Sequence, residues 1–306
     1  MPGDLTERQA FLVLNALPGL GPIAVNHLLD AFGGDPRAAL AGDGRRLKPA
    51  SGVRPEVAAA IREWRGHFDP AKEEARMEKS EVAFLTPADP GYPRLLREIH
   101  DPPVGLYRKG PYGFEHPCVA IVGTRRATLY GQAVAKRLGA ELAGRGFCVV
   151  SGLARGIDTA AHEGALSAGG RTAAVLGTGI DIIYPPENLD LYRRIADRGA
   201  ILSEFPFGRP ADRDSFPMRS RILSGICEAV VVVESDLRGG AMAAAKFAGE
   251  QGRLLFAVPG RIDQSTSAGC NQLIRDGATL LTGVGDILQE MQYLGGLRPE
   301  PLPGEG

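Results

Sequence analysis

Residues 119–179 decide the fold of this chain. They open with VAIVGTRRATLYG (119–131), continue through VVSGLARGIDTAAHEGAL (149–166) and close with TAAVLGTG (172–179). Three short apolar runs in this stretch each end at a glycine turn, and runs that are apolar at every position are typical of parallel strands buried on both faces. Because helical patterns of ten or more residues separate the runs, the stretch predicts consecutive βαβ units.

The same alternation extends in both directions from this stretch. We place two short strands, 82–85 and 104–107, in the same sheet, which extends it beyond an ordinary mononucleotide fold. Further strands are expected at 119–123, 147–151, 172–177, 200–203, 229–234, 254–258 and 279–282, and helices at 129–144, 156–168, 188–198, 218–227, 240–251, 269–276 and 284–292. The predicted fold class is α/β, with a doubly wound, mostly parallel, extended Rossmann-like sheet.

We divide the chain into three parts. Residues 1–70 have helical periodicity and form a small all-helical N-terminal domain, 71–292 form the sheet domain, and 293–306 are a linker or tail without periodicity. Within the first part, LPGLGP (17–22) lies between two helical patterns and resembles a helix-hairpin-helix turn, whose backbone N–H groups contact phosphate in nucleic acids. A plain helical turn explains the same residues equally well.

Composition narrows the class of protein. Lys and Arg number 35 against 36 Asp and Glu, so a nucleic-acid binder of this composition must concentrate its positive charge locally. The four cysteines are far apart and form no CxxC pair, which indicates reduced thiols in a cytoplasmic protein. The N-terminus does not resemble a signal peptide, and no apolar run approaches the roughly 18 residues of a membrane span.

The glycine turns predict a site for an anion, most simply a phosphate. In an open α/β sheet, ligands bind beyond the carboxyl ends of the strands, where backbone N–H groups and helix N-termini converge. The first turn does not match GxGxxG, which argues against a dinucleotide, whereas an arginine pair suits phosphate oxygens. A surface arginine pair is the alternative. The residues of these turns that we assign to the site are Gly123, Thr124, Arg125, Arg126, Ser151, Gly152, Arg155, Gly177, Thr178 and Gly179.

Other side chains have both a functional and a structural interpretation. Tyr184 could stack on a base or simply pack. Asp158 and His162 are spaced as a pair on one helix face, and we favour a hydrogen-bonded structural pair over a general base or a metal pair. Arg219 and Arg221 lie on the approach to the helix at 218–227. No catalytic triad, metal-ligand spacing or Walker sequence is present, so we expect no catalytic residue, metal or cofactor.

Longer motifs make the chain resemble a known family. They are VAIVGTRRATLYG (119–131), SGLARGIDTAAHEGAL (151–166), AVLGTGIDIIYPPEN (174–188), LSEFPFG (202–208), FPMRSRILSG (216–225), FAVPG (256–260) and GCNQLIRDGA (269–278). In this order, and covering most of 116–282, they resemble the DNA processing protein A family, also called DprA/Smf. The helical N-terminal part is similar to that family's sterile-alpha-motif-like domain.

The resemblance implies a function. It implies an extended Rossmann fold that binds single-stranded DNA, forms a homodimer, protects incoming DNA and loads the RecA recombinase onto it during natural transformation. It implies a cytoplasmic protein without enzymatic activity. From the matching positions in the family's motifs, Arg125 is the residue that we most expect to contact DNA. The glycine turns are expected to shape the pocket, and Arg155, Arg219 and Arg221 are expected to flank it.

The chain also departs from the family pattern. Arg219-Ser220-Arg221 stands where the family usually has Arg-Asn-Arg, and Arg238-Gly239-Gly240 stands where it usually has Ser-Gly-Ser. Pro186 replaces a lysine that some members carry, and Arg238 or Arg194 could supply that charge instead. Many members continue into a C-terminal winged-helix domain, for which this chain has no counterpart before it stops at Gly306.

Two other functions stay open beside DNA binding. Phosphoribohydrolases of the lysine-decarboxylase-like group share similar glycine turns, but their PGGxGTxxE motif is replaced here by SDLRGGAMAAAKFA (235–248), without Thr or Glu at the required spacing. A nucleotide-sensing scaffold would need only a mononucleotide and a protein partner. Dependence of binding on strand length separates it from a DNA-binding protein.

Overall fold

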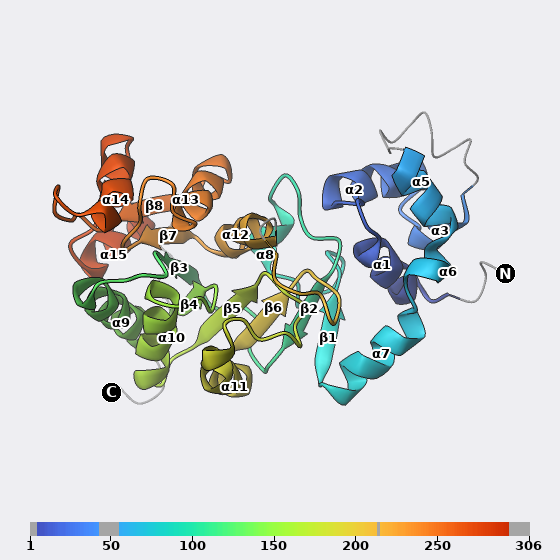
Figure 1. Cartoon of the computed structure of the whole chain (residues 1–306), viewed down its shortest axis with the longest axis horizontal. Coiled ribbons are helices and arrows are strands. Elements are labelled where there is room, and N and C mark those ends of the chain that lie inside the picture. The colour runs from blue at the N-terminus through green and yellow to red at the C-terminus, as the bar shows by residue number, and fades with distance from the viewer. Residues whose placement is uncertain (1–4, 43–54, 213–214, 294–306) are drawn as a thin grey trace.

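The chain is described by a computed structural model that covers residues 5–42, 55–212 and 215–293. Of the tail expected at 293–306, residues 294–306 lie outside this description. Within it, one nine-stranded sheet has the order β1-β2-β6-β5-β4-β3-β7-β8-β9 (Figure 1). The strands are β1 (Val82–Leu85), β2 (Leu106–Lys109), β3 (Cys118–Val122), β4 (Cys148–Ser151), β5 (Thr172–Leu176), β6 (Ala200–Ser203), β7 (Ala229–Val232), β8 (Leu254–Ala257) and β9 (Thr279–Leu280).

Seven of these strands are parallel, as the apolar runs predicted. β3, β4 and β5 are buried at every position, because helices cover both faces of the sheet. β1 and β2 are antiparallel additions: β2 pairs with β6 and β1 with β2, so the expected extension of the sheet is confirmed. β2 begins at Leu106 rather than at 104, because Val104 packs into the helical N-terminal core instead.

Helices lie on both faces of the sheet (Figure 1), so the predicted doubly wound fold is confirmed. One face packs against α9 (Leu129–Gly144), α10 (Ile157–Ser167), α11 (Leu189–Arg198) and α15 (Val284–Tyr293). The other packs against α8 (Arg94–Arg97), α12 (Ser215–Ile226), α13 (Ala241–Glu250) and α14 (Ser265–Arg275). The short 3-10 helix η2 (Pro186–Asn188) precedes α11.

Two of these helices begin earlier than the sequence predicted. α12 starts at Ser215 instead of 218, because Pro217 lies in its first turn, where a missing N–H costs nothing. α14 starts at Ser265 instead of 269, and its Gly269 N–H donates to the Ser235 carbonyl at 2.8 Å. The earlier start of α12 matters for the site, because it adds Phe216 to the first turn of the helix, one turn before Arg219.

A helical region precedes the sheet. It contains α1 (Glu7–Ala16), α2 (Pro22–Ala31), α3 (Pro36–Ala41), α5 (Pro55–Arg62), α6 (Trp64–His67) and α7 (Pro70–Lys79). α1 starts with a capping box in which Thr6 and Gln9 bond reciprocally, and α1, α2, α3 and α5 share an apolar core. The Asn15 side chain donates to the Glu204 carbonyl at 2.8 Å and thereby links α1 to the segment after β6.

Two further sequence-based expectations concern membranes and thiols. In the described ranges, no helix combines the length and apolarity that a bilayer span requires. All four cysteines are buried and free of disulfide bonds. Burial raises the pKa of the Cys227 thiol well above its usual value, so this side chain packs as a small apolar group.

Candidate functional site

A cavity of about 430 Å³ lies beyond the carboxyl ends of β3 and β7. Four segments line it: the loop after β3, Ala154 and Asp158 around the start of α10, the first turns of α12, and the start of α13 with the loop before it. Seven of the residues that the sequence assigned to the site line this cavity, namely Gly123, Thr124, Arg125, Arg126, Arg219, Gly239 and Gly240. Residues 116 positions apart in the chain therefore meet at one edge of the sheet, as expected for an open α/β fold.

The Phe216 ring lies at the centre of the basic side chains. The Arg125 guanidinium lies over this ring with its carbon 4.5 Å from the centroid, and that of Arg219 lies 5.7 Å away. The half-exposed Tyr184 ring is tilted against Phe216 at a centroid distance of 5.9 Å. Sequence reasoning did not assign Phe216 to the site, although it stands three residues before the assigned Arg219. The arrangement offers flat surfaces beside fixed positive charge.

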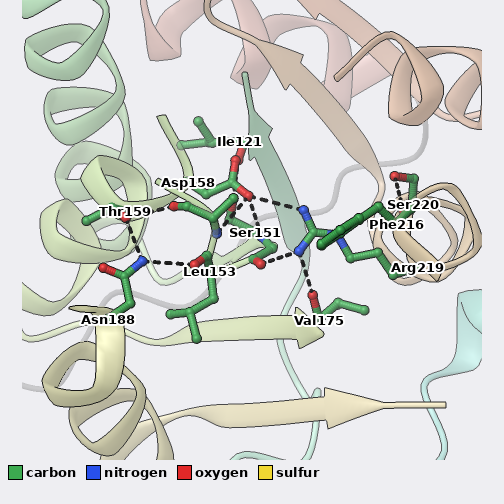
Figure 2. A network of polar contacts seen from close by, with 12 residues as sticks. Ile121, Ser151, Leu153, Asp158, Thr159, Val175, Asn188, Phe216, Arg219 and Ser220 are labelled. Atoms are coloured by element: carbon green, nitrogen blue, oxygen red, sulfur yellow. Dashed lines mark hydrogen bonds and ion pairs between the residues drawn. The ribbon is translucent and has the colours of Figure 1, made fainter. Parts of the chain in front are cut away.

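Arg219 is held by groups at the ends of β4 and β5 (Figure 2). It reaches from α12 across the strand ends, where its guanidinium donates to the carbonyls of Gly152 and Val175, the latter at 3.3 Å, and lies 3.5 Å from the Asp158 carboxylate. A Cβ at position 152 would collide with the guanidinium, so only glycine permits this approach. The Nε atom of Arg219 is buried and has no hydrogen-bond partner.

The pKa values of this pair are shifted mainly by burial. Burial lowers the pKa of Arg219, the Asp158 charge opposes that shift, and the nearby Arg125 adds to it. Burial likewise raises the pKa of Asp158, against the opposing effect of Arg219. An arginine starts so far above neutrality that it stays cationic at physiological pH. The cavity therefore keeps a fixed positive charge on its floor.

The helix N-termini at this edge of the sheet differ in whether a carboxylate of the chain itself lies beside them. Asp158, in the first turn of α10, points its carboxylate back to the turn before the helix, where it accepts from the N–H groups of Gly152 (3.2 Å) and Ala154 (3.3 Å). At α9, the Glu234 carboxylate binds the N-cap residue Thr128. The N-caps of α10 and α13, Gly156 and Gly240, have no side-chain hydrogen bond, and residues 239–241 at the start of α13 line the cavity. Because a carboxylate of the chain lies at the N-terminus of α9 and another binds the turn before α10, the expected floor of helix N-termini is reduced to α13.

The assigned residues of the second and third glycine turns, at 151–152 and 177–179, lie outside the lining of the cavity. The Ser151 hydroxyl is fully buried and donates to the Ile121 carbonyl at 2.6 Å, so it does not point to a ligand as the sequence interpretation assumed. Thr178 is likewise buried and donates to the Ile182 carbonyl. Gly177 lies against Phe216, and the Gly179 N–H donates to the Arg209 carbonyl at 2.8 Å.

Other predicted arginines lie outside the cavity lining. Arg221 follows Arg219 by two positions, about 200° around a helix, so the two face different sides of α12. The Arg221 side chain, 4% exposed, is ion-paired with Glu204 and with Asp101 at 3.0 Å. The interpretation of Arg219 and Arg221 as neighbours on the approach to a helix is therefore wrong. Arg155 is half exposed and pairs with Glu187, whereas Arg238 is exposed beside Gly239.

Asp158 and His162 do not form the predicted pair. His162 Nδ1 lies 2.6 Å from the Thr172 hydroxyl, which itself donates to the Val149 carbonyl, so Nδ1 carries the proton. Burial lowers the pKa of His162 to about 3, and the Arg219 charge adds to this shift. The Asp158 carboxylate instead pairs with Arg219 and accepts hydrogen bonds from the backbone of the second glycine turn. Arg194, a suggested substitute for the missing lysine, is paired with Glu163 at 2.8 Å.

Comparison with known proteins identifies relatives over most of the chain. A family model described as DNA recombination-mediator protein A matches residues 83–292. Protein Smf of Synechocystis sp. is 37% identical over 98% of this chain and 75% of its own length. DNA processing protein DprA of Streptococcus pneumoniae is 41% identical over 67% of this chain and 73% of its own length.

Solved structures agree with these matches. The X-ray structure of DprA from S. pneumoniae aligns with a TM-score of 0.81 and 34% identity, covering 94% of this chain and 98% of that one. DprA from Helicobacter pylori, whose structure concerns its mode of single-stranded DNA binding, aligns with a TM-score of 0.63 and 31% identity. This second alignment covers 70% of this chain and 96% of that one.

Proposed function

Because the chain belongs to the family of DNA recombination-mediator protein A, we propose that it is a single-stranded DNA-binding recombination mediator whose DNA site is the cavity at β3 and β7. The single-stranded DNA binding of the H. pylori relative supports this proposal. The proposed contacts are the seven assigned residues that line the cavity, together with Tyr184, and Arg125, Arg126 and Arg219 are the proposed phosphate-binding side chains.

One observation carries the proposal: Arg125 and Arg219 flank a single aromatic ring, Phe216, beside the uncapped N-terminus of α13. Proteins that bind single strands combine positive charge for the backbone with aromatic faces for the bases. Among the residues that the structure describes, Arg125 and Arg126 form no ion pair, so their charges are available to phosphates. Tyr184 adds a second exposed ring at the same site.

The free nucleotide is a weaker candidate ligand than a strand. An enzyme or sensor for nucleotides in this fold class would place phosphates at the N-termini of α9 or α10. The Glu234 carboxylate lies at the N-terminus of α9 and the Asp158 carboxylate binds the turn before α10, so like-charge repulsion disfavours a phosphate at both places. We also propose that no enzymatic step occurs, since Asp158 and His162 have separate buried partners and do not act together as a base.

The finer parts of the proposal come from the family resemblance. They are protection of incoming DNA, loading of RecA onto it during natural transformation, a homodimer and a cytoplasmic location. We also propose the division of the chain into a helical domain at 1–70, a DNA-binding domain at 71–292 and a linker or tail at 293–306. We assign no position to the dimer contact or to the RecA contact.

The test is fluorescence anisotropy of labelled oligothymidines of increasing length across a salt titration. We expect affinity to rise with strand length and to fall steeply with salt, because each phosphate contact releases counterions. Binding that saturates with a single nucleotide would instead support the sensor, and absence of binding at every length would overturn the proposal. Loading of RecA onto the bound strand is the next measurement after a positive result.

A further inference from the structure

Glu234 connects two parts of the site. It lies two residues after the end of β7 and is only 3% exposed. Its backbone carbonyl accepts from the Thr124 N–H at 2.7 Å. Its carboxylate accepts from the Thr128 N–H at 2.9 Å and from the Thr128 hydroxyl at 2.5 Å. One residue therefore fixes both ends of the loop 124–128, which carries Arg125 and Arg126.

The carboxylate of Glu234 also lies over the first turn of α9. Thr128 is the N-cap of this helix and accepts from the Gly131 N–H at 3.0 Å. A Cβ at position 131 would collide with the Glu234 carboxylate, so glycine makes room for it. Within the described ranges, no Lys or Arg forms an ion pair with Glu234, and the partial positive charge of the helix N-terminus is its counter-charge.

This position is where a phosphate would otherwise bind. The first helix after a glycine turn of an α/β sheet offers its N-terminal N–H groups to the phosphates of nucleotides. With Glu234 in that place, an incoming phosphate meets a buried negative charge and finds the N-cap hydrogen bonds already made. Arg125 and Arg126 lie on the other side of the same loop, where they line the cavity.

We propose that Glu234 is a positioning and specificity-determining residue: it holds the loop 124–128 so that Arg125 and Arg126 face the cavity, and it excludes nucleotide phosphates from the N-terminus of α9. The positioning half of this proposal rests on the proposed DNA-binding function. The exclusion half does not, because it concerns a helix terminus and a free phosphate. The phosphates of a DNA strand then bind to Arg125 and Arg126, and this binding does not depend on the base sequence.

The positioning half is tested with Glu234→Gln and a control, Glu141→Gln. Glu141, in α9, is half exposed and lies outside the cavity lining, so either change removes one negative charge from the protein. By charge alone, neither should weaken oligothymidine binding. We expect Glu234→Gln to weaken it by about 10-fold, since bonds to a charged acceptor are lost, and Glu141→Gln to leave it equal or stronger. Equal effects of the two variants, or no loss in Glu234→Gln, would overturn the positioning role.

A second variant separates position from charge. Gly131→Ala keeps Glu234 but pushes its carboxylate away from the helix, while alanine is itself favourable inside a helix. We expect the same loss of DNA affinity as in Glu234→Gln, with helix content unchanged by circular dichroism. Wild-type affinity in Gly131→Ala would contradict the proposal.

The exclusion half is measured by calorimetric titration with inorganic pyrophosphate. We expect pyrophosphate to bind Glu234→Ala, in which the N-terminus of α9 is empty, more tightly than the wild-type chain, which offers it only the arginines of the cavity; Gly131→Ala serves as the alternative if that variant does not fold. Equal pyrophosphate binding in wild type and variants would overturn the exclusion role. If the wild type fails to bind oligothymidine, the proposed function fails, and this titration still decides what Glu234 excludes.

Discussion

At the scale of single residues, the candidate site depends on what surrounds each charge. Arg219 and Arg221 are neighbours in sequence, yet Arg219 is fixed at the cavity floor by two carbonyls and Asp158, whereas Arg221 is buried with Glu204 and Asp101. Arg125 is exposed and stacks on Phe216. An exposed guanidinium on an aromatic face can turn to a phosphate without breaking a buried ion pair, which makes Arg125 the side chain most directly available to a strand.

The first prediction compares two exposed arginines. Arg125→Ala should weaken oligothymidine binding by roughly 10-fold or more and reduce the slope of log affinity against log salt by about one, because one phosphate contact is lost. Arg62→Ala, at the end of α5, removes an equally exposed charge far from β3 and serves as the control. Anisotropy at several salt concentrations measures both variants, and small equal effects would refute the pocket assignment.

The second prediction concerns pH. His162 takes up a proton only near pH 3 when folded, because burial lowers its pKa to about 3, but near its usual pKa of 6.5 when unfolded. Between those values the unfolded chain binds more protons, so the free energy of unfolding decreases as pH falls from about 6.5 towards 3, by up to a few kcal/mol in total.

Urea unfolding at a series of pH values measures this effect. His162→Gln should flatten the dependence in that window, since glutamine does not titrate. Replacement of the exposed His100 by Gln is the control and should leave the wild-type dependence in place. An unchanged pH dependence in His162→Gln would show that other groups cause it.

At the scale of elements, α9 and α10 cross at unusually short range. A Cβ at Gly139 of α9 would collide with the Ala161 carbonyl of α10, and a Cβ at Gly164 of α10 would collide with the Lys136 carbonyl of α9. The two glycines therefore let each helix backbone approach the other. Because α9 and α10 follow the first and second glycine turns, this contact fixes the relative position of the loops that carry Arg125 and Gly152.

The third prediction tests this contact. Gly164→Ala should destabilise the protein by about 1–3 kcal/mol, because the methyl group forces the two helices apart. Gly144→Ala, at the end of α9 with open space around it, is the matched control and should be neutral or stabilising by about 0.5–1 kcal/mol through helix propensity. Chemical denaturation measures both changes, and a neutral Gly164→Ala would mean that the helices separate without cost.

At the scale of the whole molecule, a buried ionic cluster lies where the helical region meets the sheet. Arg221 of α12 pairs with Glu204 after β6 and with Asp101, while Asn15 of α1 donates to the Glu204 carbonyl. Burial raises the pKa of Glu204, an effect that the Arg221 charge opposes. α12 therefore places Arg219 in the cavity on one of its sides. On another side it places Arg221 in the ionic cluster between the helical region and the sheet.

The fourth prediction separates these two roles. Arg221→Met should cost roughly 3–5 kcal/mol of stability, because it leaves the Glu204 carboxylate buried without its partner. The double variant Arg221→Met with Glu204→Gln should recover part of that loss. Thermal unfolding measures the stability, and oligothymidine affinity of the folded fraction should stay close to wild type. A large loss of oligothymidine affinity in a fully folded Arg221→Met variant would show that Arg221 belongs to the DNA site.

The sequence alone determined the architecture and the edge of the sheet that carries the site. Uninterrupted apolar runs alternating with helical periodicity specify buried parallel strands, and the position of a residue after such a run specifies its edge. That reasoning placed Arg125, Arg126, Gly239 and Gly240 at one cavity, because it depends only on local pattern and fold class.

Only the tertiary structure decided which side chains act together there. The partners of Arg219, Arg221, His162 and Glu234 lie 10 to 120 positions away in the chain, and several distant groups compete for each of them. Sequence spacing paired Asp158 with His162 because they share a helix face, but a buried polar group takes whichever partner the packing brings within hydrogen-bond distance. The same competition turned Arg221 away from the cavity and put Glu234 at the N-terminus of α9, where the sequence predicted an anion from outside.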